Sequence, residues 1–278
     1  TEEELIRLIR DVDGMIVGLD RVSRAVIAAA KNLKVISKYG VGLNNIDLEA
    51  ARARGIVVTY TPGTNSEAVA DLAMGLLLAV ARKIPLADRS VRSGEWHKFV
   101  GSAVWGKTIG VVGVGRIGRG VVRRARGFNM RVLCCDKIED SEFAAEYGAE
   151  YVSLEVLLEN SDFVTLHVPL TNETRGLIGK RELSQMKRTA FLINTARGEV
   201  VDEEALYQAL TRGQIAGAAL DVFHNEPPRD SKLLRLDNVI LTPHIGAHTG
   251  EAIMEMGCKA AQNLIAVLNG ILPEAIAW

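Results

Sequence analysis

The stretch 108–118, which reads Thr-Ile-Gly-Val-Val-Gly-Val-Gly-Arg-Ile-Gly, constrains the fold more than any other part of the chain. A short β-branched run breaks into glycines and then resumes as an apolar-periodic segment, which predicts a strand, a tight turn and a helix. Gly113 permits the bend, Gly115 lets backbone N–H groups approach a pyrophosphate, and Gly118 lets the helix pack on the strand. Because glycines also mark ordinary turns, the pattern needs support from its context.

A second strand expected at 130–136 supplies that context, because it ends in Asp136, about 20 residues after the glycines. A carboxylate in this place holds a ribose diol and repels a 2′-phosphate, which the neighbouring Lys137 only partly offsets. The sequence therefore predicts a dinucleotide site and favours NAD over NADP. The alternative is that Asp136 only caps its strand.

Composition limits the class of protein. With 278 residues, 48% hydrophobic and 24% charged, the chain is long enough for two globular domains with cores of their own. A formal net charge of −1 gives no general attraction to nucleic acid or to an anionic membrane. The apolar stretch 68–81 is too short to span a bilayer. Cys134, Cys135 and Cys258 suggest no disulfide framework, so we expect three core cysteines and a cytoplasmic protein.

Short β-rich runs alternate with helical patterns along the whole chain, which predicts parallel sheets with crossover helices. Before residue 60, helices are expected at 5–9, 25–30 and 48–54, and strands at 15–17, 34–37 and 56–59. Since this part starts on a helix, we expect its first strand to precede Thr1. After 136, helices are expected at 142–147, 154–159, 182–186 and 203–210, and strands at 150–152, 163–168, 190–194, 218–220 and 239–241. The fold class is therefore α/β, with doubly wound parallel sheets.

Two long helices define the expected domains. An apolar stripe from Val69 to Val80 predicts a helix that bridges two domains, and a final helix capped by Thr249 and stopped at Gly270 is long enough to cross back. We therefore expect a substrate-binding domain at 1–74 and 251–278, with the NAD-binding domain 75–250 inserted in it. The segment 93–99, which contains Trp96, is interpreted as a linker that forms either an oligomer contact or a plain surface loop.

Polar residues follow three expected strands, at 194–198, 221–227 and 242–246. Ligands of an open parallel sheet bind outside the carboxyl ends of its strands, so these turns are expected to converge on one crevice. Arg197 can bind a carboxylate through two hydrogen bonds, His244 can exchange a proton with an alkoxide, and Glu226 can orient the imidazole. This set suits reversible hydride transfer between a nicotinamide and a carbon next to a carboxylate. Arg197 as a structural ion-pair partner is the alternative.

The remaining histidines fit less specific roles. His167 stands at the end of a strand and is expected to cap it or to line the cofactor cleft, because one histidine with an acidic partner is enough for proton transfer. His97, His224 and His248 have no paired acid in a motif and are expected at the surface.

The ordered motifs resemble those of the D-isomer-specific 2-hydroxyacid dehydrogenases, the family of D-3-phosphoglycerate dehydrogenase, hydroxypyruvate/glyoxylate reductase and formate dehydrogenase. The resemblance covers nearly the whole chain, from Lys34-Val35-Ile36 through the glycine turn and the Arg197 turn to Thr242-Pro243-His244. It implies a Rossmann NAD-binding domain inserted in a flavodoxin-like substrate domain, and a homodimer formed through the long helix and the Trp96 segment.

The resemblance also implies roles for individual positions. The family's catalytic residues fall on Arg197, Glu226 and His244. Its backbone amides that hold the substrate carboxylate fall on Val41 and Gly42, where a glycine-rich turn can bind an anion. Its cofactor contacts fall on further positions: Asp221 for the nicotinamide amide, Asp136 for the ribose, Arg116 and Ile117 for the pyrophosphate, and Pro169 at a strand end, beside Gly113, Gly115 and Gly118.

Departures from the family pattern bear on the substrate. Formate dehydrogenases carry Gln where this chain has Glu226, which disfavours that activity, whereas Asn44 and His248 depart from the pattern away from the expected proton path. Phosphoglycerate dehydrogenases often place two basic residues after the strand expected at 15–17, but here only Arg21 stands there, beside Asp20.

We therefore expect an NAD-dependent enzyme resembling D-3-phosphoglycerate dehydrogenase, which acts in serine biosynthesis, with hydroxypyruvate/glyoxylate reductase as the alternative. Its expected partner is a small 2-hydroxy or 2-oxo acid, without nucleic acid, membrane or metal. An NAD(H)-sensing protein like the corepressors of this family is the alternative from another class, because one fold can serve both functions.

Overall fold

The computed structural model describes residues 1–277. Its contacts divide the chain into two compact units, one formed by Thr1–Asn65 with the chain from His248 onward, the other by Ser66–Ala247. The boundaries between the two units fall after residues 65 and 247. From the sequence we expected them after residues 74 and 250. The helix with the Val69–Val80 stripe therefore lies wholly in the second unit.

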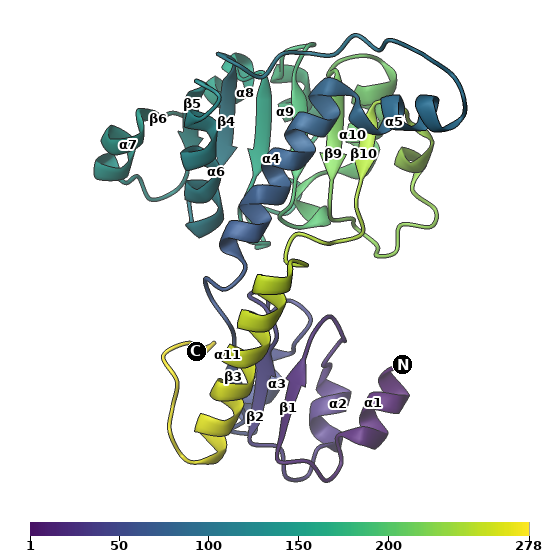
Figure 1. The fold of residues 1–278 in the computed structure, drawn as a ribbon. Helices are drawn as coiled ribbons and strands as arrows, with labels where there is room; N and C mark the ends of the chain where they lie inside the picture. The colour runs from purple at the N-terminus through teal and green to yellow at the C-terminus, as the bar shows by residue number, and fades with distance from the viewer. Residues whose placement is uncertain (278) are drawn as a thin grey trace. The chain divides into compact units, whose positions relative to one another are not determined.

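The first unit is built on a parallel sheet of three strands, β1 (Gly14–Val17), β2 (Val35–Lys38) and β3 (Val57–Thr59), in that order. Helices α1 (Glu2–Leu8), α2 (Arg24–Ala29) and α3 (Leu48–Ala53) cover one face, and α11 (Gly250–Leu268) covers the other (Figure 1). The three strands are parallel and adjacent in the order of the chain, so the unit is a second α/β domain.

Helix α11 has the ends that its sequence predicts. The Thr249 hydroxyl accepts a hydrogen bond from the Ala252 N–H at 3.2 Å, and Gly270 follows the helix with a φ of 79°. The helix is tied to the sheet of the same unit by the hydroxyl of Ser37, which donates to the carbonyl of Ala260 at 2.8 Å.

The second unit contains a parallel sheet of seven strands in the order β10-β9-β8-β7-β4-β5-β6. This order reverses between β4 and β7, as in a Rossmann sheet. The strands are β4 (Thr108–Val112), β5 (Arg131–Cys135), β6 (Ala149–Tyr151), β7 (Phe163–Leu166), β8 (Phe191–Asn194), β9 (Gly217–Leu220) and β10 (Val239–Leu241). The α-helices are α4 (Ser66–Arg82), α5 (Ile84–Arg92), α6 (Arg116–Arg126), α7 (Ser141–Tyr147), α8 (Leu154–Asn160), α9 (Lys180–Gln185) and α10 (Glu203–Thr211).

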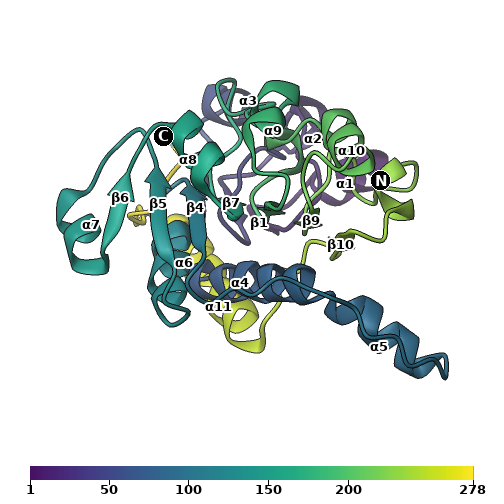
Figure 2. The same ribbon diagram turned by 90° about the horizontal axis from the view of Figure 1, so that it is seen from above.

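Helices cover both faces of this sheet, so two hydrophobic cores form. Helices α4 and α6 pack on one face with Ile109 and Val111, and α8, α9 and α10 pack on the other with Val112 (Figure 2). Gly110 lies under Leu157 of α8, where a β-carbon would come within 2.3 Å of the leucine side chain. The sheet is therefore doubly wound, as the alternating pattern of the sequence predicts.

One helix was missing from the sequence interpretation. Helix α5 follows α4 after Lys83, whose φ of 54° turns the chain, and it extends beyond the sheet in Figure 2. The chain after it exposes several large apolar side chains. These include Trp96, Val100 and Trp105.

Two further expectations concern the burial of the cysteines and the absence of a membrane-spanning helix. Cys134 is buried and Cys135 half-buried, but Cys258 is exposed on α11, so the expectation of three core cysteines was wrong at that position. Its polar neighbours on the helix surface explain the exposure, because α11 turns only one stripe toward its sheet. No helix in the described part of the chain combines the length and hydropathy needed to cross a bilayer.

Candidate functional site

The glycine turn lies at the carboxyl end of β4, where the strand order of the second unit reverses. Gly113 has a φ of 91°, and a β-carbon on it would come within 2.7 Å of the carbonyl carbon of His167 on the neighbouring chain segment. A β-carbon on Gly118 would come within 2.0 Å of the Gly113 carbonyl oxygen. Both positions therefore require glycine for the turn and for the close packing of helix on strand.

Helix α6 presents its amino end beside this turn. Gly115 is the N-cap and supplies no capping side chain, and the first turn, which starts with Arg116 and Ile117, contains no acidic residue. The positive end of the helix dipole is thus left open to an anionic ligand, and the exposed Arg116 adds a cation.

Asp136 follows β5 directly, and its carboxylate faces the glycine turn. One oxygen accepts the N–H of Val114 at 2.6 Å, and the other accepts the N–H of Ile138 at 3.2 Å. The adjacent Lys137 forms an ion pair with Glu173, so its charge is balanced by a carboxylate of the loop after β7. The carboxylate is oriented where a Rossmann fold holds a ribose diol.

Among residues 1–277, two buried polar atoms directly after the carboxyl ends of β7 and β8 lack protein partners. They are the His167 Nδ1 atom and the Thr195 hydroxyl, and the other His167 nitrogen lies 2.9 Å from the Thr165 hydroxyl. Burial lowers the pKa of His167 to about 3, so the ring is neutral near pH 7. Pro169, two residues further on, is exposed. Unsatisfied buried polar atoms beside a glycine cradle fit the polar groups of a dinucleotide.

Arg197 lies at the turn after β8. Burial lowers the pKa of its guanidinium, whereas the charges of Glu226 and Glu199 raise it, and one guanidinium nitrogen donates to the Ala196 carbonyl at 2.6 Å. The guanidinium remains a cation near neutral pH because its ordinary pKa is so high. A half-buried cation of this kind can bind a carboxylate through two hydrogen bonds.

Glu226 and His244 come from the segments after β9 and β10 and meet directly. The His244 Nδ1 atom lies 2.8 Å from the Glu226 Oε2 atom, and Glu226 Oε1 accepts the N–H of Phe223 at 3.1 Å. Burial alone would raise the pKa of Glu226, but these two hydrogen bonds, with the charges of His244 and Arg197, lower it. Glu226 is therefore an anion that can hold a protonated imidazole.

Asp221 fixes the backbone around His244. Its buried carboxylate accepts hydrogen bonds from the Thr242 hydroxyl at 2.6 Å and from the N–H groups of Ile245 and Gly246 at 2.9 and 2.8 Å. His244 itself has a φ of 54°, which a non-glycine residue adopts only when its surroundings hold it there. The resemblance assigned Asp221 a cofactor contact; the structure adds that it organises the loop of His244.

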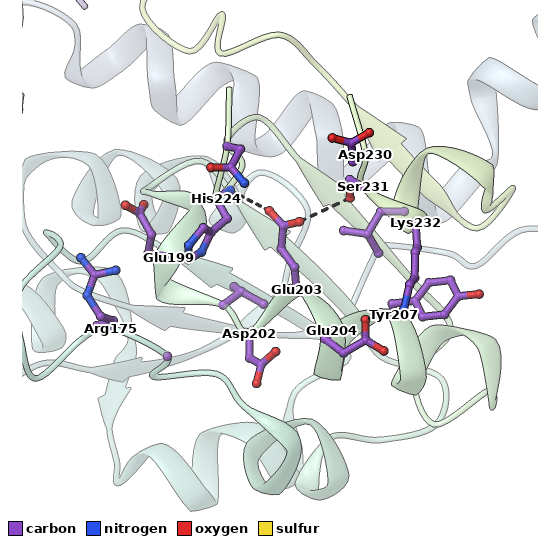
Figure 3. Close-up of a pocket in the computed structure, with 14 residues that line it drawn as sticks. Arg175, Glu199, Asp202, Glu203, Glu204, Tyr207, His224, Asp230, Ser231 and Lys232 are labelled. Carbon is purple, nitrogen blue, oxygen red and sulfur yellow. Dashed lines mark hydrogen bonds and ion pairs between the residues drawn. The ribbon is translucent and has the colours of Figure 1, made fainter. Parts of the chain in front are cut away.

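Gly198 and Glu203 are site residues that sequence reasoning missed. A β-carbon on Gly198 would come within 2.0 Å of the Phe223 carbonyl carbon, so the turn of Arg197 packs directly on the segment that carries Glu226. Glu203 lines an outer hollow of about 500 Å³ on the same unit (Figure 3). Its carboxylate binds that segment through the N–H of His224. Neither contact has a sequence motif, because both depend on tertiary packing.

The first unit carries the two proposed carboxylate-binding residues. Val41 is exposed and Gly42 half-buried, in the turn that follows β2 after Gly40, whose φ is 119°. The side chain of Asn45 donates to the carbonyls of Gly18 and Asp20 at 3.1 and 2.6 Å, so it fixes the neighbouring turn after β1.

The fold and the site define a class: a dinucleotide-binding oxidoreductase with a Rossmann domain and an acid-paired histidine. Residues 74–246 match the family model described as D-isomer specific 2-hydroxyacid dehydrogenase, NAD binding domain. The chain belongs to this family. It is therefore an NAD-dependent oxidoreductase that acts on the CH–OH group of a 2-hydroxy acid.

Individual relatives cover most of the chain. A glyoxylate reductase of Korarchaeum cryptofilum is 48% identical over 98% of this chain and 85% of the relative. A D-3-phosphoglycerate dehydrogenase of Methanocaldococcus jannaschii is also 48% identical over 99% of this chain, which spans only 53% of that longer protein. The structure of D-lactate dehydrogenase from Aquifex aeolicus, complexed with NAD and lactic acid, superposes with a TM-score of 0.88 at 32% identity, covering 95% of this chain and 85% of that one.

Proposed function

We propose that the protein catalyses the NADH-dependent reduction of a small 2-oxo acid, such as glyoxylate or hydroxypyruvate, to the 2-hydroxy acid. The observation that carries this proposal is the pairing of His244 with Glu226 at 2.8 Å, with the charge of the half-buried Arg197 acting on the same carboxylate. An acid-paired imidazole and a desolvated guanidinium together provide proton transfer and carboxylate binding.

Each side chain of this group has a distinct role. Arg197 binds the substrate carboxylate and polarises the adjacent carbonyl. His244 is bound to Glu226 through Nδ1, so its other nitrogen, Nε2, donates the proton to the carbonyl oxygen in the reduction and takes it back in the oxidation. Glu226 keeps the ring oriented and stabilises its protonated form. Asp221 holds the backbone of the His244 loop.

The cofactor residues fit NAD. Gly113, Gly115 and Gly118 form the cradle for the pyrophosphate, with the amino end of α6 at Arg116 and Ile117. Asp136 binds the ribose diol. The carboxylate of Asp221 and the exposed Pro169 lie at the ends of strands that border the proposed nicotinamide end. Bound NADH supplies the hydride for the carbonyl carbon.

The size and charge of the substrate follow from the first unit and from the relatives. After β1, Gly18-Leu19-Asp20-Arg21 offers a single cation next to a carboxylate, which does not favour a phosphorylated substrate. Relatives named glyoxylate reductase include one that is 49% identical over 97% of this chain. By resemblance, the N–H groups of Val41 and Gly42 bind a carboxylate in this unit. Because the relative from Methanocaldococcus jannaschii is a D-3-phosphoglycerate dehydrogenase, D-3-phosphoglycerate is the second candidate substrate and serine biosynthesis the second candidate role.

The test follows NADH oxidation by absorbance with glyoxylate, hydroxypyruvate, pyruvate and phosphohydroxypyruvate at equal concentrations. We expect the highest kcat/KM with glyoxylate or hydroxypyruvate. A preference for phosphohydroxypyruvate would instead establish the second candidate. NADH binding without turnover of any of the four acids would refute both and favour the NAD(H)-sensing alternative.

We propose further that the protein forms a homodimer through α5 and the segment 96–105. Ile84 and Val91 of α5, with Trp96, Val100 and Trp105 after it, are all exposed in the single chain. An extended run of exposed large apolar side chains on one segment is typical of a protein interface. The family resemblance assigns the dimer contact to the long helix, which is α4, and to the Trp96 segment, so the two surfaces share the Trp96 segment.

A further inference from the structure

The segment that carries Glu226 contains no helix or strand of its own. It runs from the end of β9 to the short 3₁₀ helix Lys232–Arg235. Its backbone hydrogen bonds from Arg229 to Pro227, at 3.0 Å, and from Ser231 to Pro228, at 3.1 Å, organise only its second half. The position of Glu226 therefore depends on contacts with the elements beside it.

Glu203 supplies such a contact on both sides of Glu226. Its Oε1 atom accepts the N–H of His224 at 2.6 Å, and its Oε2 atom accepts the hydroxyl of Ser231 at 3.3 Å. His224 precedes Glu226 and Ser231 follows it, so one carboxylate joins the chain on the two sides of Glu226. Figure 3 shows both interactions as dashed lines that meet at Glu203.

Glu203 stands on a rigid support. It is the first residue of α10, which Asp202 caps by accepting the N–H of Ala205 at 3.0 Å. Leu206 and Leu210 of the same helix are buried in the core under the sheet. A carboxylate is also favoured in the first turn of a helix by the helix dipole. Glu203 thus links the core of the domain to the chain on either side of Glu226, at His224 and at Ser231.

We infer that Glu203 is a positioning residue of the active site, which keeps Glu226 in hydrogen-bonding contact with His244. This inference rests on the proposed function. From other segments, the charge of Arg197 acts on Glu226, the charge of Glu199 acts on Arg197, and the Asp221 carboxylate accepts the N–H of Ile245 in the His244 loop. Glu203 touches neither member of the pair and acts through the backbone between His224 and Ser231.

The experiment compares Glu203→Ala and Glu203→Gln with a matched control, Glu204→Ala. Glu204 is the next residue and lines the same hollow, but it binds Lys232 at 2.9 Å and Gln208 at 3.0 Å. The amide introduced by Glu203→Gln can accept the His224 N–H and donate to the Ser231 hydroxyl, so this variant restores the hydrogen bonds without the charge.

For Glu203→Ala we expect kcat with glyoxylate or hydroxypyruvate to fall about tenfold, the effect of a small displacement of a catalytic group. The affinity for NADH stays as in the wild type. The pH profile of 2-oxo acid reduction changes, because the contact between His244 and Glu226 belongs to the proton-transferring pair. Glu203→Gln regains most of the activity and the wild-type pH profile, and Glu204→Ala matches the wild type.

A second readout does not depend on turnover. The imidazole signal of His244, assigned by its loss in His244→Gln, is titrated by NMR in the NADH-bound wild type, Glu203→Ala and Glu204→Ala. A changed titration in Glu203→Ala alone supports the inference. An unchanged titration and pH profile, even with a lower Tm, would overturn it and leave Glu203 a structural residue only. If no 2-oxo acid is reduced by the wild type, the proposed function fails while this titration still decides the role of Glu203.

Discussion

The imidazole of His244 and the carboxylate of Glu226, 18 residues apart in the chain, lie 2.8 Å from each other, and the Nδ1 atom makes this contact. Because Nδ1 is engaged, the proton that reaches a ligand must come from Nε2. The pair is fixed from both sides, since the Phe223 N–H binds the carboxylate and Asp221 binds the backbone around the imidazole.

The first prediction concerns His244→Gln. Loss of the proton donor is expected to lower kcat for 2-oxo acid reduction by about 10²- to 10⁴-fold, the usual contribution of a general acid. The Kd for NADH, measured by fluorescence titration, is expected to stay within about twofold of the wild type, because the glycine cradle and Asp136 are untouched. His224→Gln, which changes an exposed histidine, serves as the control. Wild-type turnover in His244→Gln would remove this residue from the mechanism.

Local patterns predicted the fold of the second unit well. The strand, glycine turn and helix at 108–118 and the alternation of strands with helices depend on neighbours in the sequence, as do the caps of α11 in the first unit. Because crossovers of parallel strands are restricted in hand and order, this alternation was enough to predict the doubly wound sheet.

Features that depend on tertiary packing were not predictable in this way. Helix α5 was missed because its exposed apolar residues give no buried stripe. The places of Arg197, Glu226 and His244 after strands could be derived, and their roles remain predictions. The supporting contacts of Gly198 and Glu203 could not, because each joins segments more than 20 residues apart through one close approach.

The second prediction concerns the cofactor. Asp136→Ala is expected to raise the Kd for NADH by about tenfold or more, because a charge-assisted hydrogen bond is lost. The Kd for NADPH should rise less or fall, since the carboxylate that repels a 2′-phosphate is gone. Glu150→Ala, which removes a surface carboxylate paired with Arg131 on the neighbouring strands, is the matched control. An unchanged ratio of the two Kd values would contradict the role of Asp136.

The third prediction tests the dimer. Specific interfaces bury about 1,200–2,000 Å² in total, so a charge in the centre of such a surface should separate the subunits. We expect the wild type to have the mass of a dimer in light scattering and Trp96→Glu that of a monomer. Leu234→Glu, at another exposed apolar residue of the same unit, should leave the dimer intact. A monomeric wild type would exclude this interface.

The fourth prediction is a pH dependence of stability caused by His167. Burial lowers its folded-state pKa from 6.5 to about 3, so the unfolded chain binds a proton on this histidine more readily than the folded protein. Its effect is absent above pH 6.5, and stability is lost as the pH falls from there toward 3. The slope is at most about 1.4 kcal/mol per pH unit. In urea unfolding, the stability of His167→Phe should lack this dependence on pH. The difference in free energy of unfolding between variant and wild type must therefore change between pH 6.5 and 3. Parallel curves of stability against pH would contradict the prediction.

The fifth prediction concerns the contact between the segments of Arg197 and Glu226. In Gly198→Ala the new β-carbon would lie 2.0 Å from the Phe223 carbonyl carbon and 2.4 Å from the His224 nitrogen, both backbone atoms that cannot rotate away. Forcing these segments apart is expected to cost about 1–3 kcal/mol of stability. It should also lower kcat/KM, because the guanidinium and the carboxylate that holds His244 would move relative to each other.

A glycine without this constraint provides the control for the fifth prediction. Gly75 lies exposed on α4, and a β-carbon on it would have no neighbouring atom within 4 Å, so Gly75→Ala should stabilise the protein by up to about 1 kcal/mol through helix propensity. Urea unfolding and initial rates measured on both variants separate the two cases. Because only position 198 touches the segment of Glu226, equal stability and equal kcat/KM in Gly198→Ala and the wild type would show that this close approach does not set the geometry of the site.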